Sequence, residues 1–216
     1  MTDKLLAMID AQFPLTELPC GEFGSMKVSG MKFSVRRFHA QGLGPVSVMV
    51  AKGFFGLMKM DTLIITPTEK DMPLLSYDRV LAMGNDTLIY ELYDTLLESA
   101  DLSCLDTVKT EAAYQPDHDL GSHWYDSIKL PQSIAKKGKK KEAAGFDVTA
   151  LHYLAQYLAA AVDAQSCPAQ PKLEKASVYV EGLLTHGGPS TDVFKKGIGE
   201  EKTARLFRQV LFSTKQ

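Results

Sequence analysis

The sequence predicts an α+β fold in which helices cover both faces of a central antiparallel sheet. Five consecutive segments of the first half alternate apolar and polar side chains with a period of two, which is typical of strands with one buried face. The connections between them are too short for the crossover helix that a parallel pair needs. Apolar residues at helical spacing come before and after these segments. A sheet with flanking helices packs as a sandwich, and we expect the 216 residues to form a single domain.

The expected elements follow one another without an internal repeat. A short helix over residues 3–12 stops before Pro14, because the residue that precedes a proline disfavours helical geometry. A loop rich in Pro and Gly follows, through Gly24. Strands are predicted over 26–35, 46–50, 58–66, 74–83 and 87–93, with a turn at 84–86 before the last of them. Helices are predicted over 96–105, 148–162, 178–184 and 200–212.

Two stretches of the second half carry no clear period. Residues 112–129 are polar and aromatic and are predicted to be irregular. Residues 135–144 contain the run Lys-Lys-Gly-Lys-Lys-Lys. We predict an exposed, mobile loop there, because no apolar side chain anchors the charge run.

Composition excludes several classes of protein. The chain is 45% hydrophobic and 23% charged, with a formal net charge of −2, so it has no global attraction to nucleic acid or to anionic lipid. No window approaches the ~18 apolar residues of a membrane span, and the first residues lack the pattern of a signal peptide. We expect a cytoplasmic protein and a monomer. The three cysteines form no CxxC pair, which argues against a zinc site or a disulfide framework.

Common catalytic motifs are absent from the sequence, including the glycine-rich nucleotide loops, GxSxG and HExxH. The segment 116–124 gathers Asp117, His118, Asp119 and His123, whose side chains can ligate metals. Crowding of this kind in a polar loop usually faces solvent, so we predict no metal site.

Two acidic residues lie inside predicted strands, Asp61 and Asp78. Aspartate is depleted in strands, and a carboxylate that faces an apolar core is costly unless it is hydrogen-bonded or protonated. Two interpretations are open: the carboxylates face solvent, or they act as proton donors whose pKa an apolar pocket raises. Alternation places Asp78 with Leu74, Ser76 and Val80 on one face, which we predict to be the face that the C-terminal helices cover.

Four stretches resemble a known family. The run Met-Pro-Leu-Leu-Ser-Tyr-Asp-Arg-Val at 72–80, preceded by Leu-Ile-Ile-Thr-Pro at 63–67, resembles the central hairpin of the ferredoxin-dependent bilin reductases. His-Trp-Tyr-Asp-Ser-Ile at 123–128 and the segment 195–212 are similar to later segments of that family, in the same order. The resemblance, to a divergent member, implies a three-layer α/β/α sandwich.

The resemblance also implies a chemistry. The protein would reduce a linear tetrapyrrole such as biliverdin, or a related pigment, with single electrons from an external reduced ferredoxin and with no bound metal or flavin. In this family an aspartate of the central strand protonates the radical intermediates, and its position matches Asp78. A His or Asn of the neighbouring strand falls at Asp61 or Thr62. The glutamate of the four-electron member falls near Met49, where this chain departs from the pattern.

Binding residues follow from the same resemblance. Lys136, Arg36 and Arg37 are the candidates to hold the propionates, and the lysines at 136–141 are candidates to dock ferredoxin. The family's second acidic residue is replaced here, and His186 or Asp192 are the nearby stand-ins. Three functions stay open: this reductase, a non-catalytic protein that binds a tetrapyrrole or hydrophobic anion on the same fold, or an interaction protein whose strand acids face water.

Overall fold

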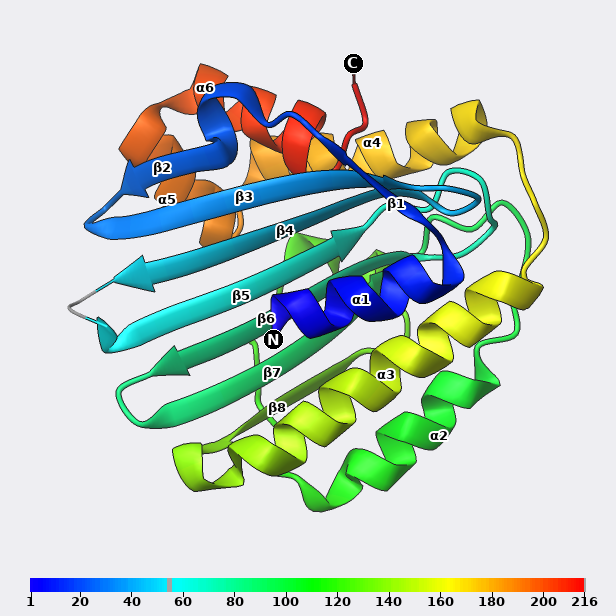
Figure 1. The fold of residues 1–216 in the computed structure, drawn as a ribbon, viewed down its shortest axis with the longest axis horizontal. Coiled ribbons are helices and arrows are strands. Elements are labelled where there is room, and N and C mark those ends of the chain that lie inside the picture. Colours follow the sequence, from blue (N-terminus) through cyan, green and yellow to red (C-terminus); the bar gives the residue numbers. More distant parts are fainter. Residues whose placement is uncertain (54–55, 216) are drawn as a thin grey trace.

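The centre of the protein is one antiparallel sheet. The computed structural model describes residues 1–53 and 56–215, and within them eight strands pair in the order β1-β3-β4-β5-β6-β7-β8, with β2 beside β3. The strands are β1 (Leu15–Leu18), β2 (Ser25–Val28), β3 (Met31–Ala40), β4 (Gly44–Gly53), β5 (Met58–Ile65), β6 (Leu74–Ala82), β7 (Asn85–Tyr93) and β8 (Ile134–Lys139). Strands β3 to β7 are sequential neighbours (Figure 1), which is the predicted meander.

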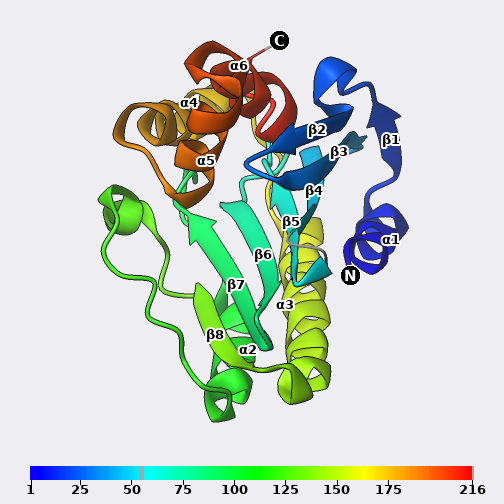
Figure 2. The same ribbon diagram turned by 90° about the vertical axis from the view of Figure 1, so that its left-hand side faces the viewer.

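Helices cover both faces of the sheet. On one face lie α1 (Thr2–Gln12), α2 (Ser103–Glu111) and α3 (Ala143–Asp163). The other face carries α4 (Ala169–His186), α5 (Pro189–Ile198) and α6 (Glu200–Arg205) (Figure 2). Helix α6 continues as the π-helical turn η6 (Leu206–Leu211). Short 3-10 turns are η1 (Gly21–Gly24), η3 (Ala112–Tyr114), η4 (Trp124–Ile128) and η5 (Lys140–Glu142). The predicted α+β class with a central antiparallel sheet is confirmed. Among the described residues, no helix is both long and apolar enough to span a bilayer.

Each strand divides its side chains between two hydrophobic cores. The α3 side holds Val48, Leu63, Tyr77 and Tyr90, and the α4 side holds Met49, Ile64 and Tyr93. The two sets alternate along the strands because successive side chains point to opposite faces. The alternation therefore decides which strand residues meet the C-terminal helices.

The turn between β6 and β7 sets the register of the sheet's centre. Its two central residues, Met83 and Gly84, have φ of 50° and 76°, the left-handed geometry of a type I′ hairpin. The predicted turn at 84–86 lies too far along the chain. Asp86 instead belongs to β7 and is completely buried, where its carboxylate accepts hydrogen bonds from Arg79.

One predicted helix begins at the wrong residue, and some observed elements were not predicted. The helix expected over 96–105 begins only at Ser103. The amides of Leu97 and Glu98 instead donate to the carboxylate of Asp71, at 2.9 and 2.8 Å, so they are satisfied outside a helix. Helix α5 was not predicted from the sequence, and neither was β1, which lies in the predicted Pro- and Gly-rich loop.

The predicted lysine loop is also wrong at its start. Residues 134–139 form β8, which completes the edge of the sheet beside β7. Lys136 is 4% exposed, whereas Lys137 and Lys139 to Lys141 are exposed. Backbone hydrogen bonds to β7 hold this segment in place. The charge pattern of the sequence does not indicate that β7 has a free edge with which the segment can pair.

Candidate functional site

A cavity of about 250 Å³ lies between the sheet and the C-terminal helices. Its floor consists of side chains of β4 to β7, with the polar groups of Thr62, Ser76, Asp78 and Glu91 among apolar neighbours. The opposite wall comes from the segment before and within η4, from α4, from residues 188–191 and from the end of the chain; it includes Leu120, His123, Tyr125, Tyr179, Leu183, Phe207, Leu211 and Phe212. The cavity therefore presents two carboxyl groups to a mainly apolar space.

Asp78 lies on this floor, on the face that alternation predicts. Thr62 is its direct cross-strand partner on β5, and the Thr62 hydroxyl donates to Asp78 Oδ1 at 2.5 Å. Burial raises the pKa of Asp78 to about 7; the Thr62 hydrogen bond opposes this effect and the nearby charge of Glu91 adds to it. A carboxyl group with this pKa is partly protonated near neutral pH, so Asp78 can donate a proton there.

Glu91 is the second acid of the cavity, and sequence reasoning missed it. It faces Ser76 across the β6–β7 ladder, so it shares the face of Asp78. Its Oε2 accepts the Tyr93 hydroxyl at 2.7 Å, and its Oε1 lies 3.6 Å from the Lys129 ammonium. The period of two over residues 87–93 could have placed Glu91 beside Asp78, but only with the register that the 83–84 turn sets.

Aromatic side chains form the wall that faces the acids. Tyr93 and Tyr179 are stacked with ring centroids 4.1 Å apart, and Tyr125 meets Tyr93 edge-on at 5.5 Å. The His123 ring lies parallel to Tyr125 at 4.8 Å, and its buried Nδ1 has no hydrogen-bond partner among the described residues. Trp124 anchors this segment, because its indole N–H donates to the Gly187 carbonyl at 3.0 Å.

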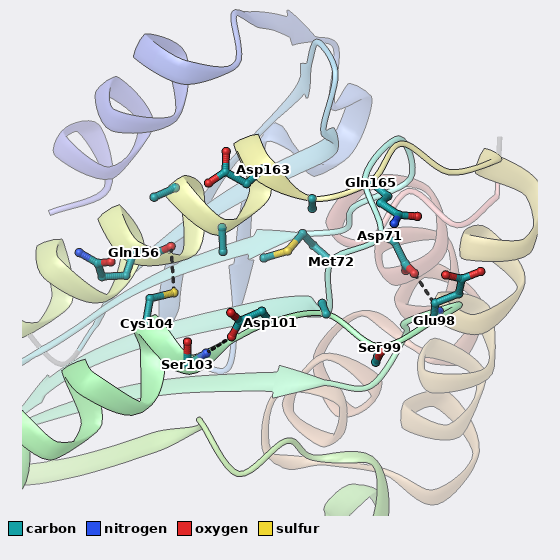
Figure 3. A pocket seen from close by; sticks show the side chains of 14 residues that line it. Asp71, Met72, Glu98, Ser99, Asp101, Ser103, Cys104, Gln156, Asp163 and Gln165 are labelled. Carbon is teal, nitrogen blue, oxygen red and sulfur yellow. Dashed lines mark hydrogen bonds between the residues drawn. The ribbon is translucent and has the colours of Figure 1, made fainter.

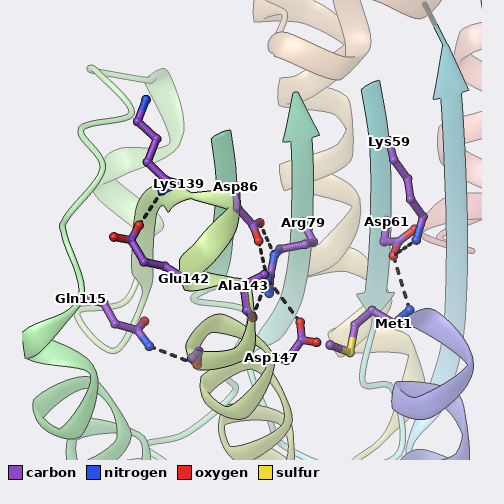
Figure 4. A network of polar contacts seen from close by, with 11 residues as sticks. Met1, Lys59, Asp61, Arg79, Asp86, Gln115, Lys139, Glu142, Ala143 and Asp147 are labelled. Atoms are coloured by element: carbon purple, nitrogen blue, oxygen red, sulfur yellow. Dashed lines mark hydrogen bonds and ion pairs between the residues drawn. The ribbon is translucent and has the colours of Figure 1, made fainter. Parts of the chain in front are cut away.

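Asp61 lies on the opposite face of the sheet from Asp78. It is buried, and its Oδ2 is 3.0 Å from the Lys59 ammonium and 3.6 Å from the N-terminal amine of Met1. Figure 4 shows this group beside a second buried ion pair, between Arg79 and Asp86. Of the two positions that the resemblance left open, the structure brings Thr62, and not Asp61, to Asp78.

The two predicted arginines lie outside the cavity. Arg36 forms a two-pronged ion pair with Glu17 of β1, with both N–O distances 2.8 Å. Arg37 donates to the carbonyls of Pro19 and Gln209, at 2.9 and 2.5 Å, and so attaches the end of the last helical segment to β3. Both guanidinium groups are occupied by contacts within the protein.

Lys136 and His186, the remaining predicted site residues of this group, also lie away from the cavity. Lys136 faces the α3 side of the sheet, opposite Leu88, and its ammonium contacts Asp117 at 2.6 Å. His186 is exposed at the end of α4, with its ring 5.4 Å from that of Trp124. The side chains that could hold an anion are thus not gathered at Asp78.

A second cavity, of about 410 Å³, lies on the α3 side between α2, α3 and the segment before α2 (Figure 3). Its polar lining includes Asp71, Asp101, Asp163 and Cys104, and none of the predicted site residues is among them. In the described ranges, no three His, Cys, Asp or Glu side chains gather as a metal site would require.

The fold defined by this sheet and its two helical layers occurs in a solved protein. The chain superposes on phytochromobilin synthase from tomato, crystallised in complex with biliverdin, with a TM-score of 0.78 and 14% sequence identity over 99% of this chain and 83% of that chain. No family model and no curated protein matches the sequence. The likeness establishes a shared three-layer fold, as the sequence resemblance implies.

Proposed function

We propose that the protein reduces a linear tetrapyrrole, with single electrons from reduced ferredoxin and a proton from Asp78. The observation that carries the proposal is a carboxyl group with a pKa of about 7 in an apolar cavity of a fold that, in the tomato enzyme, binds biliverdin. Positioned acids are effective when their pKa lies near the working pH. The Thr62 hydroxyl holds the carboxyl group in one orientation.

The size and charge of the cavity support one mode of binding. Ligand pockets usually measure about 300–1,000 Å³, and this cavity measures about 250 Å³, so the inner pyrrole rings would enter and the propionates would stay at the mouth. No lysine or arginine of the described chain lines the cavity, which agrees with that orientation. Pyrrole N–H groups would face Asp78 and Glu91, whereas a small hydrophobic anion placed there would be repelled.

A spectroscopic titration tests this function. We expect biliverdin to bind with a shifted visible spectrum, and we expect the bound pigment to lose its long-wavelength band when a ferredoxin reducing system is added. Asp78→Asn should bind the pigment and reduce it about 10²- to 10⁴-fold more slowly. Binding without reduction by the wild-type protein would favour a pigment-binding protein, and no binding at all would refute both functions.

The exposed lysines near the end of β8 are our proposed ferredoxin contact. Lys137 and Lys139 pair with Thr87 and Asn85, so they share the cavity's side of the sheet, and clustered charge accelerates encounter with an acidic partner. Changing residues 139–141 to glutamate should slow reduction and weaken its salt dependence, with pigment affinity retained. The control reverses the same number of charges at Lys27, Lys32 and Lys52, which are exposed on β2, β3 and β4. Equal effects of both triple variants would refute the contact.

A further inference from the structure

We infer that Glu91 is a second proton donor in the same cavity, acting on the ligand beside Asp78. The inference rests on the proposed reduction and goes beyond it, because it assigns the second of the two protons that this reaction consumes. It stands on the position of Glu91 on the cavity floor, on its hydrogen bonding and on its access to solvent.

The sheet register brings the two acids together. Asp78 faces Ile89 and Ser76 faces Glu91, so Asp78 and Glu91 are diagonal neighbours on one face. The Cβ atoms of such neighbours lie about 7 Å apart. Both side chains line the cavity, and a planar ligand resting on the floor would cover both.

One oxygen of Glu91 is held and the other is available. Oε2 accepts the Tyr93 hydroxyl at 2.7 Å, which fixes the plane of the carboxyl group. Oε1 is buried and accepts no hydrogen bond within the described residues, and its nearest cation is the Lys129 ammonium at 3.6 Å. A buried oxygen without a hydrogen-bond partner is costly, and a ligand N–H group placed against it would satisfy it.

Lys129 also connects Glu91 to solvent. Its side chain is 25% exposed and contacts Asp126, which is 39% exposed, at 2.8 Å. Water at this ion pair can return a proton to Glu91 after each turnover. The titratable groups that face Glu91 come from every element around it: Asp78 of β6, Tyr93 of β7, His123 before η4, Tyr125 of η4, Tyr179 of α4, and Lys129 itself.

The stoichiometry of the reaction gives Glu91 its role. Reduction of one double bond consumes two electrons, one from each of two reduced ferredoxins, and two protons, and it leaves two C–H bonds or one C–H and one N–H bond. Asp78 supplies one proton and becomes a carboxylate. The ligand then covers Asp78 and hinders its reprotonation, so Glu91 supplies the other proton. Both carboxylates recover protons from water once the product has left.

The test compares Glu91→Gln and Glu91→Asp with Glu111→Gln, an exposed acid on α2 that pairs with His152. Glu91→Gln should bind biliverdin with an affinity within about twofold of the wild-type protein, because glutamine keeps the acceptor for Tyr93. Its reduction should be about 10²- to 10⁴-fold slower at every pH and should stop after one electron. Glu91→Asp should recover part of the rate, and the Glu111 variant should match the wild-type protein.

The pH dependence separates proton donation from a purely electrostatic effect. The charge of Glu91 raises the pKa of Asp78, so an electrostatic role predicts that Glu91→Gln recovers the full wild-type rate in acid, which would overturn the inference. Loss of biliverdin binding would also overturn it. Lys129→Met provides a second test, because it removes the ion pair that connects Glu91 to solvent and should slow repeated turnover; an unchanged rate of turnover contradicts our assignment. A wild-type protein that reduces no pigment refutes the proposed function itself.

Discussion

Replacing Asp78 with asparagine should make the folded protein more stable at alkaline pH. The pKa of Asp78 is about 7 in the folded state, mainly because of burial, against an ordinary value of 3.8. Between these two values the folded protein binds more protons than the unfolded chain, so its stability falls as the pH rises. Asparagine is neutral throughout, keeps an oxygen for the Thr62 hydroxyl, and abolishes this dependence.

The magnitude follows from the pKa difference. Each pKa unit is worth 1.36 kcal/mol, so a change from 3.8 to about 7 amounts to roughly 4 kcal/mol once the carboxyl group is fully ionised. At about pH 4 the two proteins should unfold with nearly equal free energies. At about pH 8 the asparagine variant should be more stable by up to roughly 4 kcal/mol, or roughly 10 °C in Tm for a chain of this size.

Urea unfolding monitored by circular dichroism at several pH values measures this difference. The control is Asp3→Asn, whose side chain is 94% exposed, and its stability should remain parallel to that of the wild-type protein at all pH values. If the free energy of unfolding of Asp78→Asn also stays parallel to that of the wild-type protein at all pH values, the Asp78 carboxyl group is ionised in the folded state without penalty. The reasoning for a protonated Asp78 near neutral pH would then be refuted.

Three further variants test the surroundings of the site. Gly182→Ala would place a Cβ 2.1 Å from the Trp124 ring, so the emission of this single tryptophan should shift to longer wavelength; an unchanged spectrum would contradict the packing. Lys172→Ala removes a completely buried ammonium that donates to two carbonyls and a carboxylate and should cost about 3–5 kcal/mol in urea unfolding, unlike a substitution of exposed Lys32. Thr62→Val removes the hydrogen bond that lowers the pKa of Asp78, so its pH-dependent loss of stability should extend to higher pH, and an unaltered pH range would argue against the hydrogen bond.

The alternation along the strands predicted much of the fold correctly. It indicated the meander, the face on which Asp78 lies and the neighbours that Asp78 has along β6. These features follow from the period of two, which is a local property of an extended chain. The last helical segment, predicted over 200–212 and observed over 200–211, likewise follows from a local apolar stripe.

Residues that act through partners distant in the chain were not predictable in this way. Lys136 was expected to hold a ligand, yet it is buried against Asp117 because the segment pairs with the free edge of β7. Asp61 and Asp78 are equivalent as isolated strand acids, but the register turns them to opposite faces and places Thr62 opposite Asp78.

The sequence by itself determined that β3 to β7 form the centre of the sheet and which face of β6 carries Asp78, because the side-chain period of a strand is local. Tertiary structure alone decided that Glu91 joins Asp78 in one cavity and that the predicted cations do not. The physical reason is that a carboxyl group's neighbours depend on register, turn geometry and the packing of helices from the far end of the chain. A one-residue slip in the 83–84 turn would send Glu91 to the other face of the sheet.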